Sequence, residues 1–136
     1  MALVIGGDIS SIKIINPTVG AKTLYPIAGE DSEFDYGGYR NDDGGAIDGA
    51  GRPIMSKKRV PAMFSLTVSN DDALGKEFAF CNDISTARTE STVIISCLNG
   101  SILEGSAAMI TGDLKLNKQN ATFVLKMTMG SMKQKA

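Results

Sequence analysis

The stretch 92–129 restricts the fold of this chain more than any other part of its sequence. Along its last segment, apolar and polar residues alternate with the period of a β-strand. The apolar positions are Phe123, Leu125, Met127 and Met129. Such alternation is typical of a sheet with one buried and one wet face. We therefore expect the chain to be organised around a sheet of this kind.

The rest of this stretch supplies the turns and the other strands. A β-branched run leads into Asn99-Gly100, which is a strong signal for a two-residue hairpin turn. A polar segment before the last strand predicts a second turn. The stretch is therefore predicted to be a closing β-meander of two hairpins laid end to end, with strands at 92–98, 101–104, 107–116 and 121–129.

Three further strands are predicted upstream. Residues 8–15 place Ile12 and Ile14 on one face of a short strand. Residues 23–28 form a weaker strand, which Pro26 moves toward an edge because proline cannot donate to a sheet ladder. A third strand at 60–69 places Phe64, Leu66 and Val68 on one face.

One helix is predicted at 71–81. Asn70-Asp71-Asp72 supplies capping chemistry, and Leu74, Phe78 and Cys81 follow at helical spacing. The expected fold class is mainly β, a sandwich or partial barrel of two packed antiparallel sheets with one flanking α-helix and a long glycine-rich loop. At 136 residues the chain is long enough for a core of its own, so 1–136 is predicted to be a single domain.

The segment 34–59 is predicted to be a long extended loop, because six of the chain's 15 glycines lie between Gly37 and Gly51. A segment with so few apolar side chains cannot bury enough surface to order itself. Its apolar exceptions need a surface to pack against, and a neighbouring molecule is the natural candidate. These exceptions are Tyr36, Tyr39, Ile47, Ile54 and Met55.

Charge is divided unevenly around this segment. Residues 30–48 contain seven acidic residues and one basic residue, whereas 52–59 contains four basic residues and no acidic one. One interpretation is ordinary solvated loop charge. The other is that an acidic patch on one copy meets a basic patch on another, because complementary patches set register in self-assembly. On that second interpretation, the predicted subunit-interface residues are Tyr36, Tyr39, Asp42, Asp43, Lys57, Lys58 and Arg59.

Residues that carry chemistry are scarce. The chain has no histidine, and its two cysteines, Cys81 and Cys97, lie in apolar runs that favour free thiols over a disulfide. The glycine run matches no phosphate-binding motif, and the nearby acids lack calcium-loop spacing. We therefore expect no catalytic, cofactor or metal site, and not an enzyme. A net charge of −1 gives no global attraction to nucleic acid. No signal peptide or membrane anchor is predicted.

The order of elements resembles the tail tube proteins of contractile-tailed bacteriophages, in particular the short Mu-like type. The resemblance covers roughly residues 55–130. It is carried by the strand and turn at Thr92, Val93, Leu98, Asn99 and Gly100, and by the strand from Ala108 to Asn117.

The resemblance implies a structural subunit that forms hexameric rings, which stack into a tube. Its partners would be sheath protein, tape-measure protein, a baseplate initiator and a tail terminator. Genomic DNA would pass through the lumen without specific binding, and the protein would be assembled in the host bacterial cytoplasm and located in the virion tail. Two alternatives stay open: the inner tube of a contractile injection or secretion system, and an unrelated β-sandwich binding module with the glycine loop as its ligand site.

Overall fold

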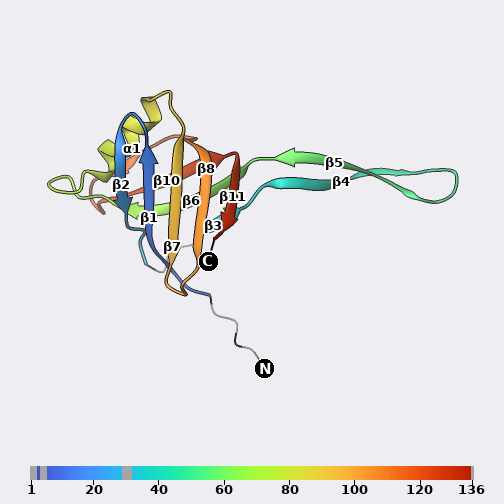
Figure 1. Ribbon diagram of the computed structural model, residues 1–136, viewed down its shortest axis with the longest axis horizontal. Coiled ribbons are helices and arrows are strands. Elements are labelled where there is room, and N and C mark those ends of the chain that lie inside the picture. Colours follow the sequence, from blue (N-terminus) through green and yellow to red (C-terminus); the bar gives the residue numbers. More distant parts are fainter. Residues whose placement is uncertain (1–2, 4–5, 29–31, 136) are drawn as a thin grey trace.

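The computed structural model describes residues 3, 6–28 and 32–135, with the side chains of residues 43 and 44 left out. It consists of two packed sheet layers, one helix and a long hairpin that projects from the body (Figure 1). The first layer contains β1 (Ile9–Asn16), β2 (Gly20–Leu24), β7 (Ser91–Cys97), β8 (Ile102–Ile110) and β11 (Ser131–Gln134). The second contains β3 (Glu33–Asp35), β6 (Ala62–Ser69), β9 (Leu116–Asn117) and β10 (Thr122–Met129). The predicted mainly-β class is confirmed.

Strand β8 belongs to both layers. It pairs with β7 and β11 in the first layer, and its last residues, Met109 and Ile110, pair with β10 in the second. Ala107 has a φ of 54° at the point where the strand changes partners. The prediction of two separate hairpins was wrong here, because 102–110 is one strand. The predicted strand 107–116 ends at Ile110, and only the short β9 follows.

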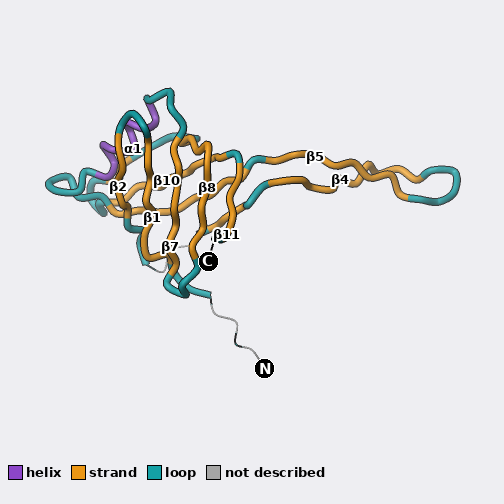
Figure 2. Tube along the Cα trace, in the orientation of Figure 1, coloured by secondary structure: helices purple, strands orange, loops and turns teal. Residues whose placement is uncertain are grey.

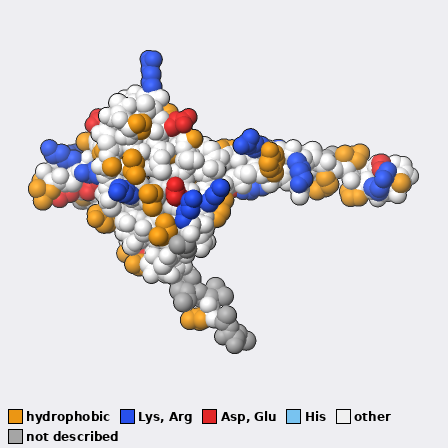
Figure 3. Space-filling model, viewed as in Figure 1, with side chains coloured by type: hydrophobic (Ala, Val, Ile, Leu, Met, Phe, Trp, Pro, Cys, Tyr) orange, Lys and Arg blue, Asp and Glu red, His pale blue; other side chains and the backbone are white. Residues whose placement is uncertain are grey.

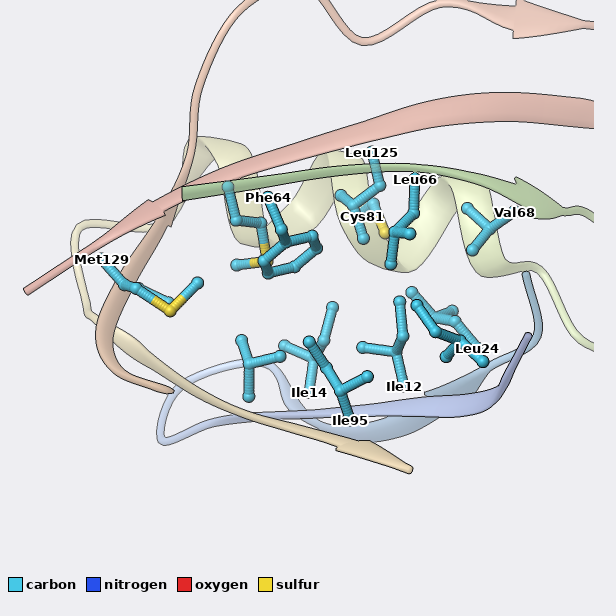
Figure 4. Close-up of a cluster of buried hydrophobic side chains, with 14 of the residues drawn as sticks. Ile12, Ile14, Leu24, Phe64, Leu66, Val68, Cys81, Ile95, Leu125 and Met129 are labelled. Atoms are coloured by element: carbon cyan, nitrogen blue, oxygen red, sulfur yellow. The ribbon is translucent and has the colours of Figure 1, made fainter. Parts of the chain in front are cut away.

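The core lies between the two layers, as the alternating patterns predicted. Leu125, Leu66 and Phe64 point from the second layer toward Ile12, Ile14 and Ile95 of the first (Figure 4). Each side chain of this size contributes roughly 1.5–3 kcal/mol when it is fully buried. The predicted apolar faces are confirmed as buried: Ile12, Ile14, Phe64, Leu66, Val68, Phe123, Leu125, Met127 and Met129.

Helix α1 (Glu77–Thr86) begins six residues later than predicted. Asp71 caps a turn instead, because its carboxylate accepts hydrogen bonds from the amides of Ala73 and Leu74. The helix starts only after Lys76, which has a φ of 53°. Leu74 is therefore 86% exposed rather than part of an apolar stripe, while Cys81 and Ile84 face the core.

The segment after β2 crosses from the first layer to the second. The predicted strand 23–28 ends at Leu24, and Pro26 forms only an isolated bridge with Val68. The amide of Ile27 donates to the carbonyl of Thr67, and the amide of Ser69 donates to the carbonyl of Tyr25. This segment therefore covers the part of the β6 edge that β3 leaves open.

The predicted loop 34–59 is mostly a two-stranded hairpin, which is the largest departure from the sequence prediction. Strands β4 (Gly38–Ile47) and β5 (Pro53–Val60) pair antiparallel and leave the body together (Figure 2). We call residues 38–60 the arm.

Candidate functional site

The arm continues the ladder that β3 and β6 form in the body. Asp35 lies opposite Met63. Three residues further along one strand and three back along the other, Gly38 lies opposite Val60. The register is therefore unchanged across the interruption. The arm is an extension of the second layer and not an independent loop.

The joint between body and arm is a close backbone crossing. Gly37 has a φ of 74°, and a Cβ built there would lie 2.6–2.8 Å from backbone atoms of Val60, Pro61 and Ala62. Pro61 has no amide hydrogen and so cannot donate to the ladder. The carboxylate of Asp35 accepts a hydrogen bond of 2.9 Å from the amide of Gly37 and another from the Arg40 guanidinium. These contacts fix the direction in which the arm leaves the body.

The tip of the arm is closed by Asp48. Its carboxylate accepts hydrogen bonds from the amides of Ala50 and Arg52 at 2.9 and 3.0 Å, and from Nε of Arg52 at 2.8 Å. The bond from the Arg52 amide is the main reason why the pKa of Asp48 lies below its ordinary value. The turn is therefore ordered by its own polar groups.

The shaft of the arm has little burial to support it. Every residue of β5 before Val60 is exposed, and an isolated two-stranded hairpin is only marginally stable in water. Several large apolar side chains are left uncovered: Tyr39 at 70% exposure, Ile47 at 70%, Ile54 at 49% and Met55 at 54%. The arm therefore has the composition of a segment that packs against another surface.

The arm carries charged side chains on both of its faces. On one face Lys58 lies 3.9 Å from Asp42, and Arg40 pairs with Asp35. The opposite face carries Tyr39, Asn41, Met55, Lys57 and Arg59, together with the ladder position of Asp43, as the register requires; we call it the cationic face after Lys57 and Arg59. Arg59 lies 5.9 Å from the centroid of the Tyr39 ring. Lys57 and Arg59 take part in none of the salt bridges formed by the described side chains. Figure 3 shows basic and hydrophobic side chains spaced along the arm.

The predicted interface residues all lie on the arm or beside its joint. The side chains of six of them belong to the described part of the structure. All six of these side chains are exposed: Tyr36, Tyr39, Asp42, Lys57, Lys58 and Arg59. Asp43 lies opposite Met55 in the ladder, and its side chain is outside the described part. The acid-rich and base-rich segments do not form distant patches, because β4 and β5 pair with each other. Their role in an interface remains a prediction.

A groove that the sequence did not predict crosses the outer face of the second layer. Its volume is about 680 Å³, and it lies at the root of the arm. The acids Glu33 and Asp35 are on one wall and Lys126 is on the other. Met63, which is 47% exposed, is the clearest signal in the sequence, since it lies on the outward face of an otherwise polar strand pattern. The groove is lined by Glu33, Phe34, Asp35, Met63, Phe64, Ser65, Thr111, Gly112, Lys126, Met127 and Thr128.

The described residues contain no cluster of three or more metal-ligating side chains. Both cysteines are free thiols, as predicted, with Cys81 buried and Cys97 partly buried. Among the described helices, none has the length and apolarity needed to cross a bilayer.

Comparison with known proteins shows similarity in fold. No protein-family model matches the chain, and no curated protein matches it in sequence. The tube-terminating cap of the anti-feeding prophage is similar over 100% of this chain and 95% of its own, with a TM-score of 0.63 and 12% identity. The sheath/tube terminator of an extracellular contractile injection system is similar over 99% of this chain and 100% of its own, with a TM-score of 0.61 and 12% identity.

A chain from the sheath–tube complex of that injection system is also similar, over 98% of this chain and 94% of its own, with a TM-score of 0.53 and 12% identity. These neighbours are structural tube or tube-terminator components. The resemblance inferred from the sequence is thereby confirmed as a likeness of fold to the tube proteins of contractile machines.

Proposed function

We propose that this chain is a structural subunit of a phage tail tube, which self-assembles into stacked hexameric rings around a hollow conduit for DNA ejection. The observation that carries the proposal is the arm, an extended and largely uncovered hairpin on a fold that tube components share along the whole chain. Packing against neighbouring copies would cover its exposed apolar side chains. The interface residues are those predicted from the sequence, on the arm and its joint.

The strands at the edges of the sheet support the proposal that the chain forms a ring. Within the described ladder, β2, β3 and β11 each pair with a single neighbouring strand. Exposed strand edges invite pairing with another chain, and closure into a barrel removes them. One subunit cannot enclose a DNA duplex, whereas six copies that give four strands each would form a barrel of about 24 strands. Stacking such rings is a heterologous contact, which generates a filament.

The proposed partners follow from this role. They are sheath protein, tape-measure protein, a baseplate initiator and a tail terminator, with the assembled protein in the virion tail. DNA in the lumen would slide without specific binding, because each phosphate neutralised by a basic residue adds affinity. Lys126 lies on the wall of the groove opposite Glu33 and Asp35, where a neighbouring subunit would shield it from the lumen.

Negative-stain electron microscopy across a concentration series tests the proposal. We expect six-fold rings or stacked hollow tubes. A chain that stays monomeric at every concentration, and also beside purified tail baseplates, would contradict the proposal and favour the binding-module alternative.

A second candidate function is the inner tube of a contractile injection system, because the structural neighbours come from such systems. Nuclease treatment of purified particles separates the two functions: protected DNA favours a phage tail, and its absence favours an injection machine. Two of these neighbours are terminators, so the protein should also be added to growing tubes. A subunit elongates them, whereas a terminator stops their growth.

A further inference from the structure

We propose that the groove on the second layer receives the arm of a second copy of this chain, with the cationic face of that arm turned into the groove. This inference rests on the proposed function, since both require self-assembly. It adds the surface that the arm occupies and the orientation in which it binds.

The occupant of the groove comes from another copy for a geometric reason. The groove begins at Phe34 and Asp35, directly beside the joint. The arm of the same chain leaves this place and points away from the body (Figure 1), and the contacts of Gly37 hold it in that direction. Strand β4 has 10 residues, which corresponds to about 33 Å at ~3.3 Å per residue. An arm of this length can cross the outer sheet face of an adjacent body.

The groove has the volume of a binding cleft, and both the groove and the cationic face expose apolar side chains. A volume of about 680 Å³ lies within the range of roughly 300–1,000 Å³ that is typical of binding clefts. Met63 supplies exposed apolar surface in the groove, and Tyr39 and Met55 supply it on the arm. Contact between these side chains would remove apolar area from water on both partners.

Charge gives the contact its orientation. Glu33 is exposed on the β3 wall of the groove, while Asp35 beside it is engaged by Arg40 of its own chain. Lys57 of an incoming arm can therefore approach Glu33. Lys126 on the opposite wall repels the same cation, so only one orientation of the arm is favourable. Charges at such a site set register and partner choice more than affinity.

The contact is heterologous, because the arm and the groove are different surfaces of one chain. Each copy offers one arm and accepts another, so the contact propagates from copy to copy. This is the pattern that a ring or a stack of rings needs.

A disulfide experiment with two chains tests the placement. Both chains carry Cys97→Ser; one also carries Met55→Cys and the other Met63→Cys, with a size tag on one chain. After co-assembly and mild oxidation, we expect a linked pair of one tagged and one untagged chain, because disulfides require Cα atoms within about 7 Å. Ile102→Cys replaces Met63→Cys in the control, since Ile102 is 37% exposed on the outer face of the first layer, and it should not link.

Charge exchange supplies a second readout. Glu33→Lys alone and Lys57→Glu alone should each raise the concentration needed for assembly by about three- to ten-fold, and the double variant should restore it. Failure of the double variant to restore assembly would overturn the pairing of these two residues.

The outcomes separate the two proposals. Rings or tubes that form without linkage between Met55→Cys and Met63→Cys overturn the groove assignment and leave the tube function standing. Linkage of Met55→Cys to the Ile102→Cys control has the same effect. Failure to form any particle contradicts the tube function, and the groove assignment fails with it.

Discussion

A Cβ at Gly37 would lie 2.7 Å from the carbonyl carbon of Pro61, so the backbone passes this point only as glycine. The φ of 74° at Gly37 adds strain for any other residue. We expect Gly37→Ala to lower the free energy of unfolding by about 1–3 kcal/mol, or to release the arm from its fixed direction. Urea denaturation measures the first effect, and spin-label distances between arm and body measure the second.

Gly49→Ala is the matched control for this joint. A Cβ at Gly49 meets no atom within 4 Å, and its φ lies outside the left-handed region. We expect this variant to change neither stability nor arm direction. Equal behaviour of the two variants would contradict a specific role for Gly37.

Strand β10 offers a test of the buried face. Leu125 is fully buried and Val124 beside it is 50% exposed. Leu125→Ala should cost about 2–5 kcal/mol of unfolding free energy, because it removes buried methyl groups and leaves a cavity. Val124→Ala should cost less than about 1 kcal/mol. Denaturant unfolding measures the loss of unfolding free energy for each variant. Similar losses would contradict the assignment of Leu125 to the buried face and Val124 to the exposed face of β10.

Asn70 caps helix α1 from outside the helix. Its side-chain oxygen accepts a hydrogen bond of 2.8 Å from the amide of Phe78, and its side-chain nitrogen donates to Asp72. We expect Asn70→Ala to cost about 1–2 kcal/mol, as the loss of a helix cap does. Asn82→Ala, at an exposed position of the helix, should be close to neutral. Thermal unfolding monitored by circular dichroism distinguishes them.

The buried thiol of Cys81 should make the free energy of unfolding fall at alkaline pH. Burial, with a smaller effect of the Glu77 carboxylate, raises the pKa of Cys81 from its ordinary value of 9.0 to about 12. The folded chain keeps the proton while the unfolded chain loses it, so this contribution is present below pH 9 and is lost as the pH rises toward 12. At pH 10 the wild type should have lost about 1.4 kcal/mol more than Cys81→Ala, relative to pH 8. Parallel pH profiles for the two proteins would refute this.

The sequence predicted the body of the fold better than its elaborations. The faces of β6 and β10 were readable because burial on one side of a strand imposes a period of two. The Asn99-Gly100 turn was readable because its backbone demands particular residues; Gly100 has a φ of 93°. These signals are local, and local signals survive in a single sequence.

The arm could not be predicted in the same way. The residues of β5 before Val60 are exposed on both faces, so no alternation marks it as a strand. Its pairing with β4 is instead inherited from the contact of β3 with β6 in the body, which is set by residues distant in the sequence. The helix start was misplaced for a similar reason, because Asn70 reaches Phe78 across a turn that Asp71 stabilises. The groove arises from neighbouring strands that no short motif describes.

The register continues unshifted from the β3–β6 pair into the β4–β5 pair. This continuity limits how the length of the arm can change in evolution. The length of the arm can change in descendants without disturbing the body, because residues can be gained or lost in both strands beyond the joint. Insertion or deletion of two residues in each strand keeps every remaining side chain on its original face. Insertion or deletion of one residue in each strand moves the side chains beyond that point to the other face. Arm lengths in homologues are therefore expected to differ in steps of two residues per strand, each step shifting the reach of the tip by about 6.6 Å.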